Sequence, residues 1–336
     1  MSRQQPHAIA LFSGGLDSCL AVLLMLKQEI KVTALTFLMH FGCDATDKSS
    51  CAHDPYPVAE KFGFEVKMMH LGQKFIDIVR NPRHGRGKNM NPCVDCRILM
   101  LSQAKEYMEI VGADFVVSGE VLGQRPFSQM RDKLNLTIRE SGLRGRLLRP
   151  LSAKLLEPTI PELEGLVDRE KLEGISGRSR RRQMELAAEF GLTDYPSPAG
   201  GCLLTDPEYA HKLKDLLDHD AEASYTDINL LRAGRHFRFS PQTKIIVGRH
   251  QEDNQKIEMM AEPGDLFCEV KNTGSPITLI RGVDSEEARR MACALTARYS
   301  RKRSEREVEV TWAKGVETGT IIVSPAPEDI LEQFRV

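Results

Sequence analysis

Residues 8–26, AIALFSGGLDSCLAVLLML, join a short apolar run to a longer one through a glycine-rich loop. The first run, Ala8 to Phe12, is short and predicts a buried strand. The second, Leu20 to Leu26, is apolar on all sides and predicts a buried helix. The loop between them, SGGLDS at 13–18, offers two glycines, two hydroxyls and one carboxylate. Because backbone N–H groups and a helix N-terminus favour a bound anion, we expect this loop to hold a phosphate group.

Strand and helix patterns keep alternating after this unit. Apolar runs at 32–37, 65–69 and 115–117 predict further strands, and residues 57–62 predict a helix. Between 98 and 111, apolar residues recur at spacings of three and four, which places them on one face of a helix. This alternation predicts an α/β fold with a parallel sheet, whose binding crevice lies beyond the carboxyl ends of the strands.

The pattern changes from about Asp227. Strand-like runs then surround one helix pattern at 286–299, and these runs are 244–247, 266–270, 277–280, 308–312 and 320–323. A strand-rich pattern of this kind predicts a smaller α+β domain. We therefore expect a nucleotide-binding domain over 1–207 and a second domain over 208–336, in keeping with the total length of 336 residues.

The composition excludes some classes of protein. The chain has 46 Lys and Arg against 47 Asp and Glu, a formal net charge of −1, so it does not bind nucleic acid through bulk charge. No apolar run reaches the ~18 residues that a membrane span needs, and the N-terminus lacks the pattern of a secretory signal peptide. We expect a cytoplasmic protein without a membrane partner, in which the eight cysteines do not form structural disulfides.

Three cysteines stand in polar surroundings rich in glycine or proline. Cys93 and Cys96 form the Cys-x-x-Cys of NPCVDC, just before a helix pattern, and Cys202 follows the turn YPSPAGG. A cysteine at a helix N-terminus, next to Arg97, can have a lowered thiol pKa. By itself, Cys-x-x-Cys fits a redox pair, half of a zinc site or a pair of iron–sulfur ligands.

The loop SGGLDS resembles the PP-loop of N-type ATP pyrophosphatases, which adenylate a substrate and release pyrophosphate. The resemblance implies that ATP and Mg²⁺ are bound, with Asp17 orienting the loop or holding the metal ion. It implies phosphate contacts from Ser13, Gly14, Gly15, Asp17 and Ser18, an adenine site at Leu35, Thr36 and Phe37, and further contacts from Gly119 and Gln124. The segments SGEVLGQ (118–124) and LRPL (148–151) resemble tRNA 4-thiouridine synthetases.

The cysteine segment NPCVDC is similar to a segment of tRNA 2-thiouridylases, in which one cysteine and a distant later one transfer sulfur. Related PP-loop thiolases hold a 4Fe-4S cluster on three cysteines. The resemblance therefore makes Cys93, Cys96 and Cys202 candidate catalytic residues and candidate cluster ligands, because thiolates suit soft metal centres. Three interpretations stay open: a cluster with one open iron, a persulfide relay between Cys93 and Cys202, or a structural role in packing or on zinc.

Local basic clusters are candidate RNA contacts on this chain of near-zero net charge. They lie at 80–92, which contains no acidic residue, at 178–182, and at 298–306. The segment from KIIVGR at 244–249 to SPI at 275–277 resembles the NFACT-type RNA-binding domain of ribosome-quality-control proteins. This resemblance implies a tRNA partner.

The combined resemblances imply an ATP-dependent tRNA sulfurtransferase. It would adenylate a uridine carbonyl, release pyrophosphate and insert sulfur from sulfide or from a persulfide-carrying donor. SGEVLGQ favours 4-thiouridine, while NPCVDC favours 2-thiouridine at the wobble position through a cysteine persulfide. Two further hypotheses are a PP-loop enzyme that adenylates a small molecule and a non-catalytic RNA-binding quality-control module.

Overall fold

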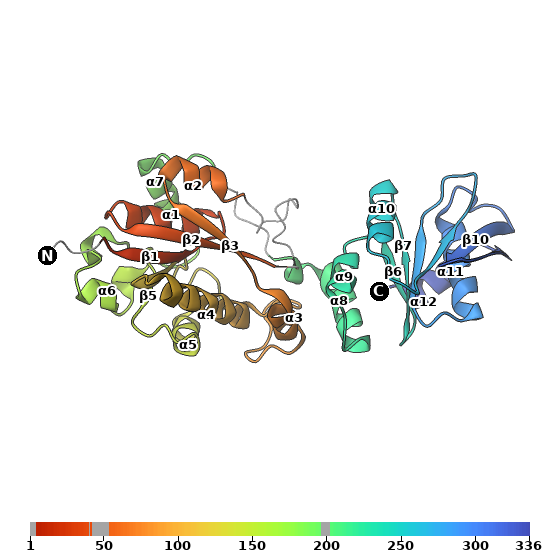
Figure 1. Cartoon of the computed structure of the whole chain (residues 1–336), viewed down its shortest axis with the longest axis horizontal. Helices are drawn as coiled ribbons and strands as arrows, with labels where there is room; N and C mark the ends of the chain where they lie inside the picture. The colour runs from red at the N-terminus through yellow and green to blue at the C-terminus, as the bar shows by residue number, and fades with distance from the viewer. Residues whose placement is uncertain (1–4, 40, 42–53, 196–201) are drawn as a thin grey trace. The chain divides into compact units, whose positions relative to one another are not determined.

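The computed structural model describes residues 5–39, 41, 54–195 and 202–336, so the turn predicted before Cys202 lies largely outside the described residues. The chain divides into two compact units, Met1–Asp206 and Pro207–Val336, shown in Figure 1.

The first unit is built on a five-stranded sheet in the order β3-β2-β1-β4-β5. All four neighbouring pairs run parallel. The strands are β1 (His7–Leu11), β2 (Lys31–Leu38), β3 (Glu65–His70), β4 (Phe115–Ser118) and β5 (Leu147–Leu148). The predicted parallel α/β sheet is confirmed, and the strand order reverses direction around β1, where the glycine-rich loop begins.

Helices cover both faces of this sheet. They are α1 (Leu16–Leu26), α2 (Tyr56–Phe62), α3 (Gly72–Arg80), α4 (Cys93–Val111), α5 (Arg131–Glu140), α6 (Ile160–Leu163) and α7 (Arg181–Glu189), with 3₁₀ turns η1 (Ala153–Leu155), η2 (Arg169–Lys171) and η3 (Leu203–Thr205). Figure 1 shows α2 and α7 on one side of the sheet and α4 and α5 on the other. Helix α1 contacts α7 as well as β1, β2 and β4, which explains why its sequence is apolar on all sides.

The second unit contains a six-stranded sheet in the order β11-β10-β8-β9-β7-β6, with every pair antiparallel. Its strands are β6 (Arg235–Ser240), β7 (Thr243–Val247), β8 (Leu266–Glu269), β9 (Thr278–Gly282), β10 (Val308–Lys314) and β11 (Glu317–Val323). Its helices are α8 (Pro207–His219), α9 (Tyr225–Leu230), α10 (Gln251–Met259), α11 (Glu286–Tyr299) and α12 (Glu328–Phe334). The predicted strand-rich α+β character is confirmed.

Helix α11 packs across this second sheet and contacts five of its strands, β7 to β11. A separate apolar cluster of Leu230, Ile257, Ile246 and Leu279 joins α9 and α10 to β7 and β9. Of the helices in the described residues, none combines the length and the apolar character that crossing a membrane requires.

Candidate active site

The glycine-rich loop lies between β1 and α1, as the sequence predicts. Gly14 has a φ of 70°, a left-handed conformation that a side chain disfavours. The Ser18 hydroxyl donates to the carbonyl of Gly15 (2.8 Å) and accepts from the N–H of Ser13 (3.3 Å). These contacts fold the loop back over the first turn of α1, where orphan N–H groups and the helix dipole favour an anion.

Asp17 stands at the centre of the polar contacts in this loop. Its Oδ2 accepts a hydrogen bond from Gln124 Nε2 at 3.1 Å and lies 3.6 Å from a guanidinium nitrogen of Arg180. Its Oδ1 is buried and has no hydrogen-bond partner among the described residues. A buried carboxylate oxygen without a partner is costly, so this atom suits a bound cation or a ligand donor group.

A cavity of about 270 Å³ opens beside the loop. Residues predicted for the nucleotide site line it: Ser13, Gly15, Asp17, Ser18, Thr36, Phe37, Gly119 and Gln124. Leu35 and Gly14 are not among the lining residues, and the Leu35 side chain is fully buried. The hydroxyl of Thr36 and the amide oxygen of Gln129, also in the lining, are buried and have no hydrogen-bond partner in the part of the chain that the structure describes. The cavity therefore combines orphan polar atoms with the apolar Phe37, as a site for a nucleoside phosphate requires.

The three candidate cysteines line this same cavity. Cys93 and Cys96 lie in the first turn of α4, and Cys202 directly precedes η3. All three side chains are half-buried. The fold thus brings together a Cys-x-x-Cys segment, a distant cysteine and the glycine-rich loop, which are far apart in the sequence.

Two hydrogen bonds join the backbone near the cysteines. The N–H of Met90 donates to the carbonyl of Leu204 at 3.0 Å, and Asn89 Nδ2 donates to the carbonyl of Thr205 at 2.8 Å. The chain just before Cys93 is therefore tied to the turn just after Cys202.

The expectation of a lowered thiol pKa at Cys93 is wrong. Burial raises the pKa of the Cys93 thiol, and this effect outweighs the opposing influence of Arg125 and Arg97. Desolvation disfavours the thiolate more than the two cations favour it.

The donor set offers soft thiol ligands, but the described residues contain no group of three or more His, Cys, Asp or Glu that could hold a metal ion. The three thiols share one cavity, which fits an iron–sulfur cluster in donor chemistry. A structural zinc site usually has four protein ligands, and the cavity lining contributes three thiols.

A buried charge network that the sequence did not predict supports the cavity wall. Glu120, 2% exposed, accepts from Arg149 Nε at 3.0 Å and lies 3.1 Å from Arg97 Nε. Burial acts to raise the pKa of Glu120, but Arg97 and Arg149 outweigh it and hold that pKa below its ordinary value. Glu120 follows Gly119 in SGEVLGQ, and its position between two charges is fixed only by the tertiary fold.

The basic clusters separate into different roles. Arg180 lines the cavity beside Asp17, whereas Arg182 pairs with Glu173 at 2.8 Å. Arg86 donates to two backbone carbonyls at the end of α3, a structural contact.

In the third basic cluster, at 298–306, Arg303 and Arg306 are exposed and have no ion pair among the described residues. Arg125, which also lines the cavity, was not singled out from the sequence.

Both units are similar to known protein families. Residues 3–154 match the family model described as thiamine biosynthesis protein (ThiI), and residues 234–335 match the NFACT protein RNA binding domain. The two units are thus similar to two different families, the first to ThiI and the second to the NFACT RNA-binding domain. The resemblances drawn from SGGLDS and from the C-terminal strands are therefore confirmed.

Curated relatives agree over part of the chain. A probable tRNA sulfurtransferase of Thermococcus kodakarensis is 30% identical over 36% of this chain and 31% of its own length. A tRNA-specific 2-thiouridylase MnmA of Syntrophotalea carbinolica is 29% identical over 35% of this chain and 36% of its own length. The chain thus spans about a third of the length of these relatives.

Solved structures match more distantly. A 4-thiouridine synthetase in complex with RNA and bound ATP matches at 16% identity and a TM-score of 0.35, over 56% of this chain and 52% of its own.

Proposed function

We propose that this protein is an ATP-dependent tRNA sulfurtransferase that acts in the cytoplasm. One observation carries the proposal: the glycine-rich loop and the cysteines Cys93, Cys96 and Cys202 line a single cavity. Activation by ATP and delivery of sulfur can therefore occur at the same carbon atom. The names of the relatives, tRNA sulfurtransferase and tRNA 2-thiouridylase, support tRNA as the substrate.

The first step is adenylation of a uridine carbonyl. The carbonyl oxygen attacks the α-phosphorus of ATP, and pyrophosphate leaves. Ser13, Gly15 and Ser18 stabilise the phosphoryl oxygens through hydroxyl and backbone N–H groups at the start of α1. One carboxylate oxygen of Asp17 accepts a hydrogen bond from Gln124, and the other has no partner among the residues that the structure describes, so Asp17 is suited to hold Mg²⁺ on the phosphates.

The second step replaces the activated oxygen by sulfur. A sulfur nucleophile attacks the adenylated carbon, and AMP leaves with the oxygen. A 4Fe-4S cluster on the three cysteines would supply an open iron that binds sulfide, while the protein holds the adenylated base against the cavity wall. Arg97 and Arg125 line the cavity and are suited to bind the phosphate groups of the RNA or of AMP.

A persulfide relay is the second candidate route, and the 2-thiouridylase relatives favour it. The terminal sulfur of a persulfide on Cys202 or Cys93 would attack the carbon, and AMP would leave. The other cysteine would then release the thiocarbonyl and form a disulfide, which a thiol reductant must reduce. We favour 4-thiouridine as the product because of SGEVLGQ, and 2-thiouridine is the alternative.

The test uses tRNA nucleosides and pyrophosphate. Mass spectrometry of tRNA from a deletion strain should show the loss of one thiouridine, and its chromatographic behaviour distinguishes 4-thiouridine from 2-thiouridine. Purified wild-type protein should release pyrophosphate only when tRNA is present, and Asp17→Asn should abolish the release. A deletion strain with unchanged thiouridines, or a D17N variant with unchanged pyrophosphate release, would contradict the proposal.

A further inference from the structure

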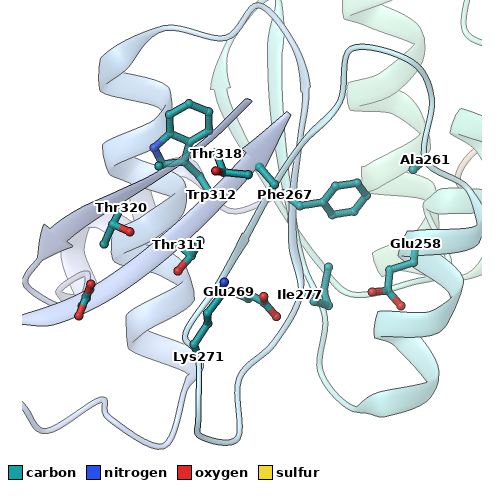
Figure 2. A pocket seen from close by; sticks show the side chains of 13 residues that line it. Glu258, Ala261, Phe267, Glu269, Lys271, Ile277, Thr311, Trp312, Thr318 and Thr320 are labelled. Carbon is teal, nitrogen blue, oxygen red and sulfur yellow. The ribbon is translucent and has the colours of Figure 1, made fainter. Parts of the chain in front are cut away.

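The C-terminal unit holds a larger cavity, of about 650 Å³, on one face of β8, β10 and β11. The antiparallel register sets the facing residues: Thr311 pairs with Glu269 on one side and with Thr320 on the other. Ala313 likewise pairs with Phe267. Because paired residues in a sheet point to the same face, these side chains lie on one face of the sheet and line the same groove. Figure 2 labels Thr311, Thr320, Glu269 and Phe267 among them.

One end of the groove is apolar. Phe267 and Ile277 line it together with Ala261, which follows α10. Figure 2 shows the Phe267 ring reaching toward Ala261, and the Glu258 side chain extending toward Ile277. This end can receive an aliphatic chain of a ligand, while the carboxylate of Glu258 stands at its edge.

The rest of the groove is acidic. Glu258, Glu269 and Glu309 line it and are exposed, and Lys271 is the lining cation. In the part of the chain that the structure describes, none of these carboxylates has an ion pair or a hydrogen-bonded side chain. Such a surface repels an RNA backbone and attracts a cation. No residue of the basic cluster 298–306 lines the groove.

We propose that this groove docks an extended, basic segment of a protein partner. Lysine and arginine side chains fit both parts of the groove. Their aliphatic stems can pack on Phe267 and Ile277 at the apolar end, while their charged heads pair with Glu269 and Glu309 in the acidic part. A cavity of this size accommodates a few side chains, since ligand sites commonly measure about 300–1,000 Å³. The proposal goes beyond tRNA thiolation and does not rest on it.

The test is fluorescence anisotropy with full-length protein and a labelled peptide in which lysine and valine alternate. Glu269→Gln with Glu309→Gln should weaken binding roughly fivefold, the effect of two exposed ion pairs. The matched control is Asp329→Asn with Glu332→Gln, which removes two exposed carboxylates from α12 and should leave the affinity unchanged. An otherwise identical peptide with glutamate in place of lysine should not bind.

Three results would overturn the proposal. The first is that the wild-type protein fails to bind the lysine–valine peptide. The second is that the two double variants bind this peptide equally well. The third is that a single-stranded RNA displaces the peptide from the wild-type protein and binds less tightly to the E269Q/E309Q variant than to the wild type. The last result would assign the groove to RNA. Because the substituted side chains are exposed, folding should be preserved, and the urea unfolding of each variant checks this.

Discussion

Gly119 lies so close to Asp17 that an added Cβ would stand 2.5 Å from the Asp17 carbonyl oxygen and 2.7 Å from the N–H nitrogen of Ser18. The end of β4 and the first turn of α1 are therefore in backbone contact. Because both neighbours are backbone atoms, neither can move without moving the glycine-rich loop.

We expect Gly119→Ala to displace this loop. The added methyl group should lower stability by about 1–3 kcal/mol and weaken ATP binding, because the N–H groups of the loop lose their alignment. Isothermal titration with ATP and urea unfolding measure the two effects. Gly174→Ala is the control, since its Cβ would meet no atom closer than 3.5 Å. Equal ATP affinity of the Gly119→Ala and Gly174→Ala variants would contradict the close contact between Gly119 and the backbone of Asp17 and Ser18.

Glu120→Gln should strongly destabilise the first unit. Glu120 neutralises Arg149, which is almost fully buried, and Arg97 at the cavity wall. Removing its charge leaves the buried Arg149 guanidinium without its carboxylate partner, and we expect a loss of about 3–5 kcal/mol in the free energy of unfolding. Glu65→Gln breaks a half-exposed pair with Lys67 and should cost less than about 1 kcal/mol. Similar losses for both variants, measured by urea unfolding with circular dichroism, would refute this role.

Iron content distinguishes the two routes of sulfur transfer. If the three cysteines hold a 4Fe-4S cluster, protein purified without oxygen should be brown and contain about four irons per chain. Cys96→Ser should then lose both iron and thiolation, whereas Cys268→Ala, buried in the second unit, should keep them. A colourless, iron-free and active enzyme that tolerates C96S would instead support the persulfide relay.

Arg303 and Arg306 should contribute to tRNA binding through phosphate contacts. We expect Arg303→Ala with Arg306→Ala to weaken tRNA binding about tenfold at low salt and to reduce the slope of log K against log salt by about 1–2. Lys256→Ala with Arg290→Ala also removes two exposed positive charges and should have little effect, because both side chains pair with glutamates on their own helices. Identical salt slopes for the two double variants would show that Arg303 and Arg306 do not contribute to tRNA binding.

Acid should weaken the second unit through His236. Burial lowers the pKa of this fully buried imidazole well below its ordinary value, and Lys244 and Lys212 add to the effect. The unfolded chain therefore binds a proton below pH ~6.5 that the folded unit excludes, so the free energy of unfolding falls by up to about 1.4 kcal/mol per pH unit.

Urea unfolding at neutral and mildly acidic pH measures this effect. The only tryptophan of the chain, Trp312, lies in β10 and reports on this unit through its fluorescence. His236→Asn should reduce the pH dependence, and His211→Asn, at an exposed position, should not. A pH dependence that His236→Asn leaves unchanged would contradict the assignment.

The elements with strong apolar patterns were predictable from the sequence. The strands around the glycine-rich loop and the helix at 286–299 follow directly from residue spacing. Strand β6 did not, because RHFRFS places Arg235 and Arg238 among its apolar residues. Arg238 pairs with Asp215 of α8, a partner distant in sequence that stabilises a charged residue in the strand.

Parts of the site could not be predicted for the same reason. The sequence groups Arg180 with Arg181 and Arg182, but only the fold turns Arg180 toward Asp17 and the other two toward glutamates. The pKa of Cys93 was misjudged because local neighbours favour the thiolate, and burial, which decides the direction, depends on the whole unit. The sequence therefore predicted which chemical groups take part in the site, but it could not predict the burial and the charged neighbours of each group.

The hydrogen bonds from Asn89 and Met90 to the turn after Cys202 also fix when the site can form. A ribosome makes the chain from its N-terminus, so Cys93 and Cys96 emerge long before their distant partner segment. Until residues 202–205 leave the ribosome, one wall of the cavity and its tie to the loop before α4 do not exist. A nascent chain can fold its sheet and still lack one wall of the cavity, so the sulfur transfer that we propose would require a first unit whose synthesis is complete.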